Sequence, residues 1–564
     1  MKHKILKLTA VLPALLLLAG CDIEPVFYQQ VAPDTFYDSK DAVWQRFYRS
    51  FTHARWTFAQ DGSPFTLQEL GTDEFCSPVR GSQNASREEG HQMHYHNFPT
   101  YFGASYQVYG SRMTGVARCW AAVDDLRPLD LSKYGFPEGT WDNWVAQLTA
   151  LAGLYYLEAM DCYGGLPLYS ESAEEELPRS TAAETFKFIE NLFKTAIPNL
   201  EVKTVLGSEE KGDIRQAMAA LGLAKLYFNA VSYIGEDYYS EAAKICQDLI
   251  DGKYGSYALD RDWTQIFGFN NSRSNEIIWS IPSERAQLAT DGNYEWSNQM
   301  PTNMSQYFGG VPDSNGSNKY CLTPSLDGNG NPYTYKLGSP FSKFEDTDVR
   351  KKKYRYLGKG KYEGMFIFGE LVNPDNPSWK VTGTQEYAGQ TLRIVDQIAR
   401  LSEGKTESSM ETGEENSGIR LVKYSPRPNA SDATLLFNPD IPIMRLTEAY
   451  YILAECKWRS GDRKGAADLI NEVRSRYFEN GNDPNPATAE NLDQWRMLDE
   501  WMIEFIGEKR RRTDLIRWNQ YITGEWWDHK PDGGSNSYKK LFPISTHHLD
   551  VSSVLTQNPG YDDK

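Results

Sequence analysis

The chain lacks several signatures of nucleotide-binding, hydrolytic and metal-binding proteins. It contains no CxxC pair, no P-loop, no GxSxG nucleophile elbow, no HExxH motif and no GxGxxG fingerprint. The absence of CxxC excludes zinc-ribbon and thioredoxin-like sites. The other absences remove the most specific motifs that would indicate an enzyme. A glycosidase-like pair of carboxylates stays open among the 76 acidic residues, because sequence alone cannot place two of them about 5–10 Å apart.

Positive charge is also scarce. The 564-residue chain has 59 lysine and arginine residues against 76 acidic ones, which gives a formal net charge of −17 at pH 7. Nucleic-acid phosphates require a basic surface, so this balance argues against nucleic acid as a partner. Two short basic runs, residues 351–353 and 510–512, do not reverse the balance, and we expect them to be solvated or paired with carboxylates.

A second long apolar run is missing after the first 21 residues, so we expect the body of the protein not to cross a membrane. Three lysines precede an apolar stretch over residues 8–19, which has the length and flank of a signal peptide. Small residues then lead to Cys21, as in a bacterial lipobox. We predict a signal peptide over residues 1–20 and a tether over residues 21–40 anchored by acyl chains on Cys21. The alternative is an ordinary secretory signal with a chance cysteine.

The seven cysteines are few and widely scattered. If Cys21 is acylated, six remain, and an exported location permits them to form disulfides. The sequence leaves their pairing open. Cys162, Cys246 and Cys456 lie in helical patterns, so we expect these three to be buried thiols.

Aromatic residues, in contrast, are abundant. The chain has 15 Trp, 34 Tyr and 25 Phe, which together make up 13% of its residues. Many must pack in the core, yet flat amphipathic rings also suit a protein that stacks on sugars.

Helical periodicity dominates residues 41–250. Residues 220–245 and 449–470 share a pattern of helix, glycine-containing turn and a second helix with small alanines. This pattern resembles a tetratricopeptide helix pair, in which small residues let two helices approach closely. A looser candidate pairs residues 101–126 with residues 142–163.

The helical period disappears between residues 251 and 440, which are rich in Gly, Asn, Pro, Ser and aromatics. Within this excursion, residues 403–418 are polar and glutamate-rich and are predicted to form a mobile loop. A long irregular segment attached to a regular scaffold is typically functional. We therefore predict a mainly α fold: helix pairs at residues 41–250 and 441–564 form one scaffold, and the loop-rich excursion, with minor β structure, carries the ligand face.

The C-terminal part contains the most specific resemblance to a known family. Residues 445–455 read RLTEAYYILAE and resemble the R-x-x-E-x-Y-x-x-x-A-E signature of the SusD/RagB family. The further matching segments are INEVRSR at 470–476, EFIGEKRRRTDLIRW at 504–518, FPI at 542–544, QNPGY at 557–561 and, in the first half, YGGLPL at 163–168. The family's usual "ER" ahead of the EF segment is replaced here by Glu500-Trp501.

This resemblance implies a surface-exposed outer-membrane lipoprotein of Bacteroidetes. Proteins of this family bind nutrients, mostly glycans, and pair with a SusC-like TonB-dependent β-barrel importer; they are not enzymes. The fold implied is one helical body with four tetratricopeptide-like units and a loop-rich face that holds the ligand. We therefore expect an oligosaccharide or polysaccharide ligand, an importer partner and no cofactor.

The segment ELGTDEF at residues 69–75 resembles a family stretch that leads into loops near the ligand face. Aromatic rings suit the apolar face of a sugar, and Asp, Asn, Arg and His suit its hydroxyls. The predicted ligand-binding residues are Asp73, Arg80, His94, Tyr95 and Asn97 from this region, and Tyr294, Trp296, Tyr307, Tyr320 and Trp379 from the excursion. For any single aromatic, packing under its own loop is the competing interpretation.

Two segments have the elements of metal sites. His94 and His96 would share a face in a strand and could bind zinc, but no third ligand lies nearby in sequence and we predict no metal there. Asp327 begins a calcium-like DGNGN stretch, but Pro332 replaces the turn glycine and Gly338 stands where a bidentate glutamate belongs. A plain turn is therefore favoured, with a structural calcium ion as the alternative.

Glu500, Glu504 and Glu508 recur every four residues beside the basic run 509–512. On a helix this spacing predicts a structural ladder of ion pairs between residues four apart rather than an acid–base site. The functional alternatives that the sequence leaves open are a peptide or other nutrient binder of the same family, a glycan-cleaving hydrolase, and a tetratricopeptide scaffold without a small ligand.

Overall fold

A computed structural model describes residues 37–561, apart from 61, 81–86, 174, 210, 270, 283–297, 309–315, 359–360 and 425–438. Cys21 and the predicted signal peptide lie outside the described residues, as do Tyr294 and Trp296.

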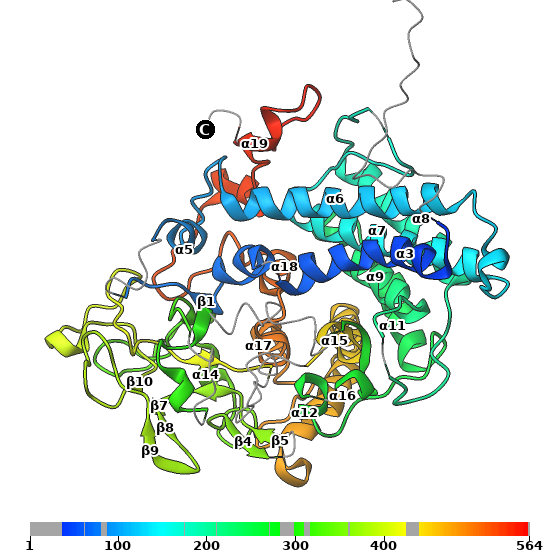
Figure 1. The fold of residues 1–564 in the computed structure, drawn as a ribbon. Coiled ribbons are helices and arrows are strands. Elements are labelled where there is room, and N and C mark those ends of the chain that lie inside the picture. The colour runs from blue at the N-terminus through cyan, green and yellow to red at the C-terminus, as the bar shows by residue number, and fades with distance from the viewer. Residues whose placement is uncertain are drawn as a thin grey trace, which may run out of the picture.

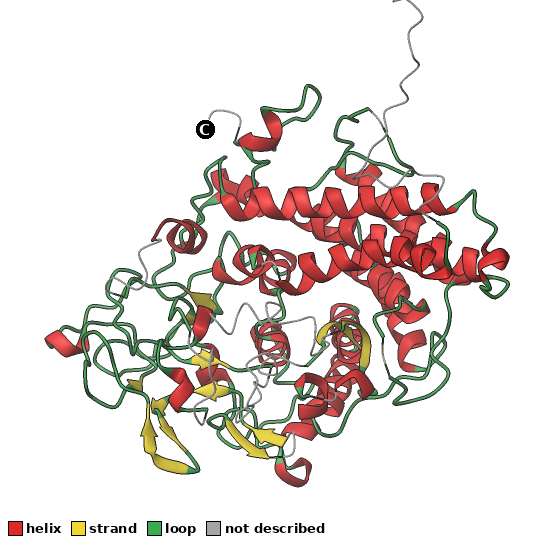
Figure 2. Ribbon diagram, viewed as in Figure 1, coloured by secondary structure: helices red, strands yellow, loops and turns green. Residues whose placement is uncertain are grey.

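Helices make up most of the regular structure, and they are concentrated in the first half of the chain and near its C-terminus (Figures 1 and 2). Their bounds are α3 Lys40–Arg55, α4 Ser63–Phe65, α5 Arg87–His94, α6 Gly103–Leu126, α7 Thr140–Tyr163, α8 Ala182–Ala196, α9 Gln216–Phe228, α10 Ala230–Ile234, α11 Tyr239–Ile250, α12 Thr264–Phe267, α14 Pro340–Lys343, α15 Leu446–Arg459, α16 Arg463–Arg474, α17 Gln494–Phe505, α18 Arg511–Arg517 and α19 Thr546–Leu549.

Eight of these helices form a continuous stack. α3 packs on α6, α6 on α7, and the series continues through α8, α9, α11, α15 and α16. Figure 1 shows the stack running along the upper and right side of the molecule and then down its centre. The stack has the antiparallel, neighbour-to-neighbour packing of tetratricopeptide-like helix pairs, so the predicted fold class is confirmed.

The ends of the helices follow from local sequence. Thr181 caps α8 in a capping box, because its hydroxyl accepts from the Glu184 amide while the Glu184 carboxylate accepts from the Thr181 amide. Asp462 caps α16 by accepting from the Gly465 amide at 2.9 Å. Gly164 ends α7 at a φ of 73°, a conformation that glycine adopts without a steric cost.

The two matching sequence segments both form the predicted helix pairs. Residues 220–245 contribute to α9 and α11, and residues 449–470 contribute to α15 and α16. Ala454 on α15 and Ala466 on α16 have no exposed surface. Small side chains on both faces allow the two helices to pack closely.

Strands are short and occur as antiparallel pairs among the described residues (Figure 2). Their bounds are β1 Phe75–Cys76, β2 Ile277–Ile281, β3 Cys321–Leu322, β4 Arg355–Gly358, β5 Lys361–Glu363, β6 Phe366–Ile367, β7 Gly369–Glu370, β8 Val372–Asn373, β9 Asn376–Lys380, β10 Arg393–Ile394, β11 Arg420–Leu421 and β12 Ile441–Arg445. The pairs are β1–β3, β2–β12, β4–β5, β6–β11, β7–β10 and β8–β9. Most lie between α11 and α15, so the loop-rich region is a long insertion between two helices that pack on each other.

The prediction of a mobile loop over residues 403–418 is wrong. Glu414 and Glu415 are buried, and the Glu415 carboxylate accepts hydrogen bonds from the amides of Thr384 and Tyr387 at 2.9 and 3.0 Å. Acidic side chains here bind the backbone of a neighbouring loop, which composition alone cannot distinguish from solvation.

The glutamates every four residues are structural, but most of their partners are not those that the ladder predicted. Glu500 pairs with Arg496 four residues earlier and also with Arg474 on α16. The Glu504 carboxylate lies 2.7 Å from the guanidinium of Arg445 and accepts from the Tyr477 hydroxyl at 2.8 Å. These glutamate side chains pair with residues of other elements because most of α17 is buried against neighbouring segments.

Two further expectations are confirmed by burial. Cys162, Cys246 and Cys456 are buried free thiols. The basic run at residues 510–512 is paired with carboxylates: its three arginines contact Glu448, Asp73 and Asp161. Among the described residues, no helix is both long and apolar enough to cross a membrane.

Candidate functional site

Five of the predicted ligand-binding residues are buried and make contacts inside the protein. The Asp73 carboxylate pairs with Arg511 at 2.7 Å. The Arg80 guanidinium donates to the carbonyls of Asn318 and Ser417 at 2.8 and 2.9 Å. These are the contacts of residues that join segments of the fold, and both side chains have no exposed surface.

The three buried aromatic candidates have similar environments. The Tyr307 hydroxyl donates to the Tyr354 carbonyl at 2.6 Å. Tyr320 stacks on Phe65 with a centroid distance of 5.7 Å. His94, the last residue of α5, lies edge-on to Trp527 at 5.5 Å. None of the three presents its ring to solvent, which matches the packing interpretation rather than a sugar platform.

Three other candidates are exposed but do not converge. Tyr95 and Asn97 follow α5, and the Tyr95 side chain is 41% exposed. Trp379 is 38% exposed on β9. Figure 1 shows α5 and the β8–β9 hairpin well separated on the loop-rich side. The structure therefore gives two separate exposed positions, of which the one at Tyr95 has the richer surroundings.

The surroundings of Tyr95 combine an aromatic ring with carboxylates. Its hydroxyl donates to Asp528 at 2.6 Å, and Asp528 also accepts from the Met410 amide at 2.8 Å. Burial, together with the hydrogen bond and charge of Asp528, raises the pKa of Tyr95 well above its usual value, so the phenol stays protonated. Next to it, His91 pairs with the exposed Glu411 at 3.2 Å.

Further tyrosines extend this surface. Tyr333 and Tyr335 stack with a centroid distance of 5.6 Å and are both partly exposed. Trp527, which lies against His94, donates from its indole to the Ser408 hydroxyl at 2.9 Å, and Ser408 is also a hydrogen-bond partner of Tyr333. We call this set the Tyr95 surface; it comprises Tyr95, Tyr333, Tyr335, Glu411 and Asp528.

Sequence reasoning identified only one member of the Tyr95 surface as a ligand-binding residue. Tyr333 and Tyr335 are two positions apart and follow the turn residues Asn331 and Pro332. In an extended segment this spacing puts both rings on one side, which could have indicated an exposed aromatic pair. Glu411 and Asp528 stand 316 and 433 positions after Tyr95, so nothing local in the sequence connects them with it.

A cavity of about 150 Å³ lies inside the molecule, between the helical stack and the C-terminal helices. It is lined by both apolar and charged side chains, including Glu158, Lys225 and Glu448. The charged groups are already paired: Arg112 contacts Glu158 at 2.6 Å and Lys225 contacts Glu448 at 3.0 Å. Such a lining has no carboxylate left over for acid–base chemistry, and the cavity is the weaker candidate site.

The turn at Asp327 has its own hydrogen bonds. The Asp327 carboxylate accepts from the backbone amides of Asn329 and Asn331 at 2.8 and 2.9 Å. This is an Asx-type turn, in which the side chain binds the backbone that follows it.

Comparisons with known proteins identify one family from the sequence and show similar folds among solved structures. The model of the SusD family matches residues 275–561. The starch-binding protein SusD of Bacteroides thetaiotaomicron is 24% identical over 459 residues, which are 77% of each chain. Among solved structures, surface glycan-binding protein A from Bacteroides thetaiotaomicron in complex with laminarihexaose has a TM-score of 0.65 at 16% identity, with 92% of this chain and 99% of that chain covered. NanU of B. fragilis has a TM-score of 0.68 at 15% identity, with 95% and 100% covered.

Proposed function

The chain belongs to the SusD/RagB family, and on this premise we propose that it is a cell-surface glycan-binding lipoprotein that passes oligosaccharides to a SusC-like TonB-dependent importer. Two similar proteins named above bind starch or were solved with laminarihexaose, which supports glycan as the ligand class here. The proposal places the protein at the outer membrane, held by acyl chains on Cys21.

The single observation in this molecule that carries the proposal is the Tyr95 surface. The exposed Tyr95 ring lies beside the carboxylates of Glu411 and Asp528, and the stacked, partly exposed Tyr333 and Tyr335 are connected to it through Ser408, Trp527 and His94. A pyranose has an apolar C–H face and a rim of hydroxyls. Tyrosine rings can stack on the face, and carboxylates can accept hydrogen bonds from the hydroxyls. Because these rings are partly exposed, they can stack on a sugar without any rearrangement of the hydrophobic core.

Binding without conversion is supported by the state of the buried carboxylates. Glu276, Glu500 and Glu504 are each paired with arginines of neighbouring elements. Carboxylates held in this way are engaged in joining elements of the fold, whereas a glycosidase needs two carboxyl groups free to flank the scissile bond. A hydrolase is therefore the less supported alternative.

Calorimetry with a glycan selected from an array tests the proposal on residues 22–564. Tyr95→Ala and Tyr333→Ala should each weaken binding by about 1–2 kcal/mol or more, since aromatic anchors contribute this much at binding surfaces. Tyr106→Ala is the matched control, because Tyr106 is exposed to a similar degree (38%) but lies on α6. Unchanged glycan affinity in both variants would show that the ligand binds elsewhere than on the Tyr95 surface.

Trp296 remains a predicted platform residue that lies outside the described part of the chain. Trp296→Ala should weaken glycan binding by about 2 kcal/mol while leaving the melting temperature unchanged. Trp458 is the control, because its indole donates to the Leu492 carbonyl at 2.6 Å and packs edge-on to Trp518. Loss of Trp458 should lower stability rather than affinity.

Chromatography and cell fractionation separate the remaining alternatives. Oligosaccharide incubated with the purified protein should be recovered intact; shortened products would favour a hydrolase. Cys21→Ala should release the protein from the outer membrane, because the acyl chains supply the membrane affinity. Binding of peptides in preference to glycans would keep the family role and change the ligand class.

A further inference from the structure

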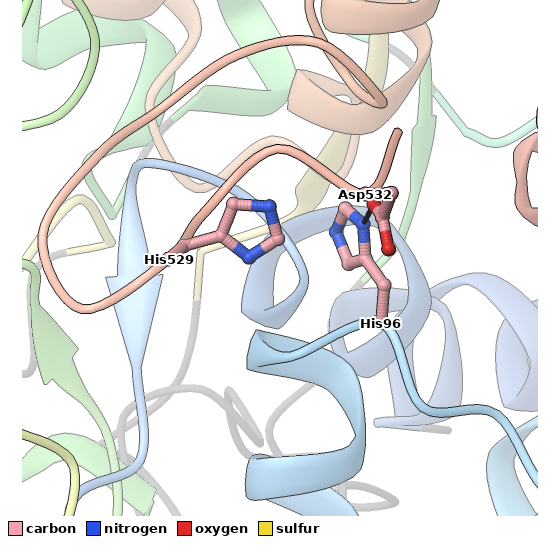
Figure 3. A group of neighbouring side chains, drawn as sticks. All are labelled: His96, His529 and Asp532. Atoms are coloured by element: carbon pink, nitrogen blue, oxygen red, sulfur yellow. Dashed lines mark hydrogen bonds and ion pairs between the residues drawn. The ribbon is translucent and has the colours of Figure 1, made fainter. Parts of the chain in front are cut away.

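Three side chains from the two ends of the chain meet below the Tyr95 surface. His96, His529 and Asp532 offer ring nitrogens and a carboxylate oxygen that all lie within 4.8 Å of one another. Figure 3 shows the two imidazoles and the carboxylate gathered between the turn after α5 and the loop at residues 526–532. The two histidines are at most 2% exposed. The sequence did not predict this cluster, because no third ligand lies near His94 and His96 along the chain.

The orientation of His529 leaves one ring nitrogen available. Its Nδ1 lies 2.6 Å from the His94 carbonyl and must donate to it, because a carbonyl oxygen only accepts. The Nε2 atom then carries the lone pair, and it is buried without a hydrogen-bond partner. The ring is held in place by stacking on Trp526 at 3.8 Å. A backbone carbonyl that fixes one nitrogen and leaves the other free is the usual second contact of a metal-binding histidine.

His96 has the corresponding arrangement with its nitrogens exchanged. Its Nε2 lies 2.9 Å from the Gly71 carbonyl and donates to it. Its Nδ1 faces the Asp532 carboxylate at 2.6 Å, with a proton shared between them. The ring stacks on Tyr521 at 4.2 Å. Thus Nδ1 of His96 lies against the Asp532 carboxylate, Nε2 of His529 has no partner, and Figure 3 shows the His96 ring between the other two side chains.

We propose that His96, His529 and Asp532 form a binding site for a divalent transition-metal ion, with Zn²⁺ the best fit. Two imidazoles and one carboxylate are ligands that Zn²⁺ accepts in proteins. A tetrahedral ion with bonds of about 2.0–2.1 Å holds its donor atoms roughly 3.4 Å apart. Donor atoms 4.8 Å apart would therefore close by about 1.4 Å, and the His96 and Asp532 atoms that are 2.6 Å apart would open by about 0.8 Å. The ion takes the place of the proton that His96 and Asp532 share, and that proton leaves to solvent.

The other contact of Asp532 sets the charge of the site. Its second carboxylate oxygen accepts from Lys539 at 2.7 Å. The ammonium group orients the carboxylate and also opposes an incoming cation, so it tunes affinity downward. This predicts a site that binds one ion reversibly rather than one that requires metal to fold.

A bound metal ion would affect the geometry of the Tyr95 surface. Tyr95 stands between His94 and His96, and Asp528 directly precedes His529, so the hydrogen bond between Tyr95 and Asp528 bridges the two segments that the ion joins. A bound ion would hold both segments at fixed separation and thereby preorganise the Tyr95 surface. This consequence, unlike the metal site itself, rests on the proposed glycan-binding function.

Metal titration of the full mature chain, purified with a tag that contains no histidine, tests the site. After removal of metal with a chelator, we expect one equivalent of Zn²⁺ to bind in calorimetry and to raise the melting temperature. Co²⁺ should bind in its place and give the visible d–d absorption of a low-coordinate site of nitrogen and oxygen ligands. This measurement can be made on the wild-type protein alone. Absence of uptake by the wild-type protein for both ions would overturn the proposal and leave His96 and Asp532 as an ion pair only.

A matched pair of variants assigns the ion to these residues. His529→Asn keeps a donor for the His94 carbonyl but removes Nε2, and it should weaken Zn²⁺ binding at least about tenfold, since even orienting partners contribute that much. Asp532→Asn serves the same purpose if the first variant fails to fold. His548→Gln is the control, because its ring already binds the Tyr106 carbonyl near the surface. Zn²⁺ binding that is undiminished in both His529→Asn and Asp532→Asn would contradict the site, and its loss in His548→Gln would place the ion there instead.

The test is independent of glycan binding. Uptake of Zn²⁺ with no effect on glycan affinity would support the metal site and remove only its proposed influence on the Tyr95 surface. Failure of the protein to bind any glycan would count against the proposed function and not against the metal site.

Discussion

Arg511 and Asp73 form a bidentate ion pair across 438 positions of the sequence, with donor–acceptor distances of 2.7 and 2.9 Å. The Asp73 carboxylate also accepts from the Gly338 amide at 2.8 Å. Burial alone would raise the pKa of Asp73, but Arg511 outweighs it and holds that pKa below its ordinary value. One carboxylate thus joins the N-terminal segment, the loop-rich insertion and α18.

Asp73→Asn should therefore lower the free energy of unfolding by about 3–5 kcal/mol, because it leaves a buried guanidinium without its counter-charge. Urea denaturation measures this loss. Asp375→Asn, which breaks the exposed pair with Arg355, is the control and should cost less than about 1 kcal/mol. If Asp73→Asn keeps its stability and loses glycan affinity instead, Asp73 is a ligand-binding residue after all.

Glu69 and Glu74 are buried carboxyl groups that interact with each other, and they accept hydrogen bonds from the amides of Arg510 and Gly507 respectively. Burial raises both pKa values, that of Glu69 to about 7. A raised carboxyl pKa means that the folded state holds the proton more tightly than the unfolded chain. Its stabilising contribution is complete below the unfolded pKa of about 4.5 and is lost as pH rises through about 7.

Glu69→Gln should abolish that part of the pH dependence. Between pH 5 and pH 8 the wild-type protein should lose up to about 3 kcal/mol more stability than the variant, since one pKa unit corresponds to 1.36 kcal/mol. Urea unfolding of both proteins at the two pH values gives the difference. Equal losses in the two proteins would show that Glu69 does not hold the proton.

Cys76 and Cys321 are register partners in the β1–β3 pair, with 3.6 Å between their sulfur atoms. Burial opposes ionisation of Cys321, but the hydrogen bond from Cys76 and the guanidinium groups of Arg80 and Arg420 lower its pKa to about 6. A thiolate beside a thiol is the arrangement from which a disulfide closes.

Oxidised glutathione should convert this pair to a disulfide, with two molecules of reduced glutathione as the other product. The reaction should be slow because both sulfur atoms are buried. Intact mass after alkylation in denaturant should show two fewer alkylated thiols, and Cys321→Ser should remove that change. Cys246→Ser is the control: it removes a buried thiol on α11 outside the pair, so the oxidant should still cause the loss of two alkylated thiols.

Ala466→Phe should destabilise the protein by about 1–3 kcal/mol or more, because the larger ring must enter the closed contact between α15 and α16. The melting temperature of Ala466→Phe should fall relative to Lys464→Phe on the same helix, where the native side chain is 80% exposed. Equal melting temperatures would place Ala466 at the surface.

The helical stack was predictable because its information is local. Alanines at residues 454 and 466 and the capping residues at the helix starts specify packing within a few turns. The ligand face was less predictable because burial and partners depend on distant segments. Arg80 and Tyr307 have the chemistry of sugar-binding residues, yet backbone carbonyls contributed by later parts of the chain occupy their polar groups.

The same limit explains the histidines. In a strand His94 and His96 would share one face, but α5 ends at His94 and His96 follows it in a turn at a φ of 48°. Both rings pack against His529, and only that of His96 binds the Gly71 carbonyl. The partners of His96, Gly71 and Asp532, stand on either side of it at separations of 25 and 436 positions. Periodicity within a short segment carries no information about such contacts.

The pairing of the three arginines at residues 510–512 also makes the first half of the chain depend on its C-terminal part. A chain truncated at residue 505 contains every helix of the stack, but it lacks the guanidinium groups that face Asp73 and Asp161. Carboxylates that lose their partners resist burial, so the first half should not pack stably over Asp73 and Asp161 without α18. The last tenth of the chain should therefore be required for the rest to fold.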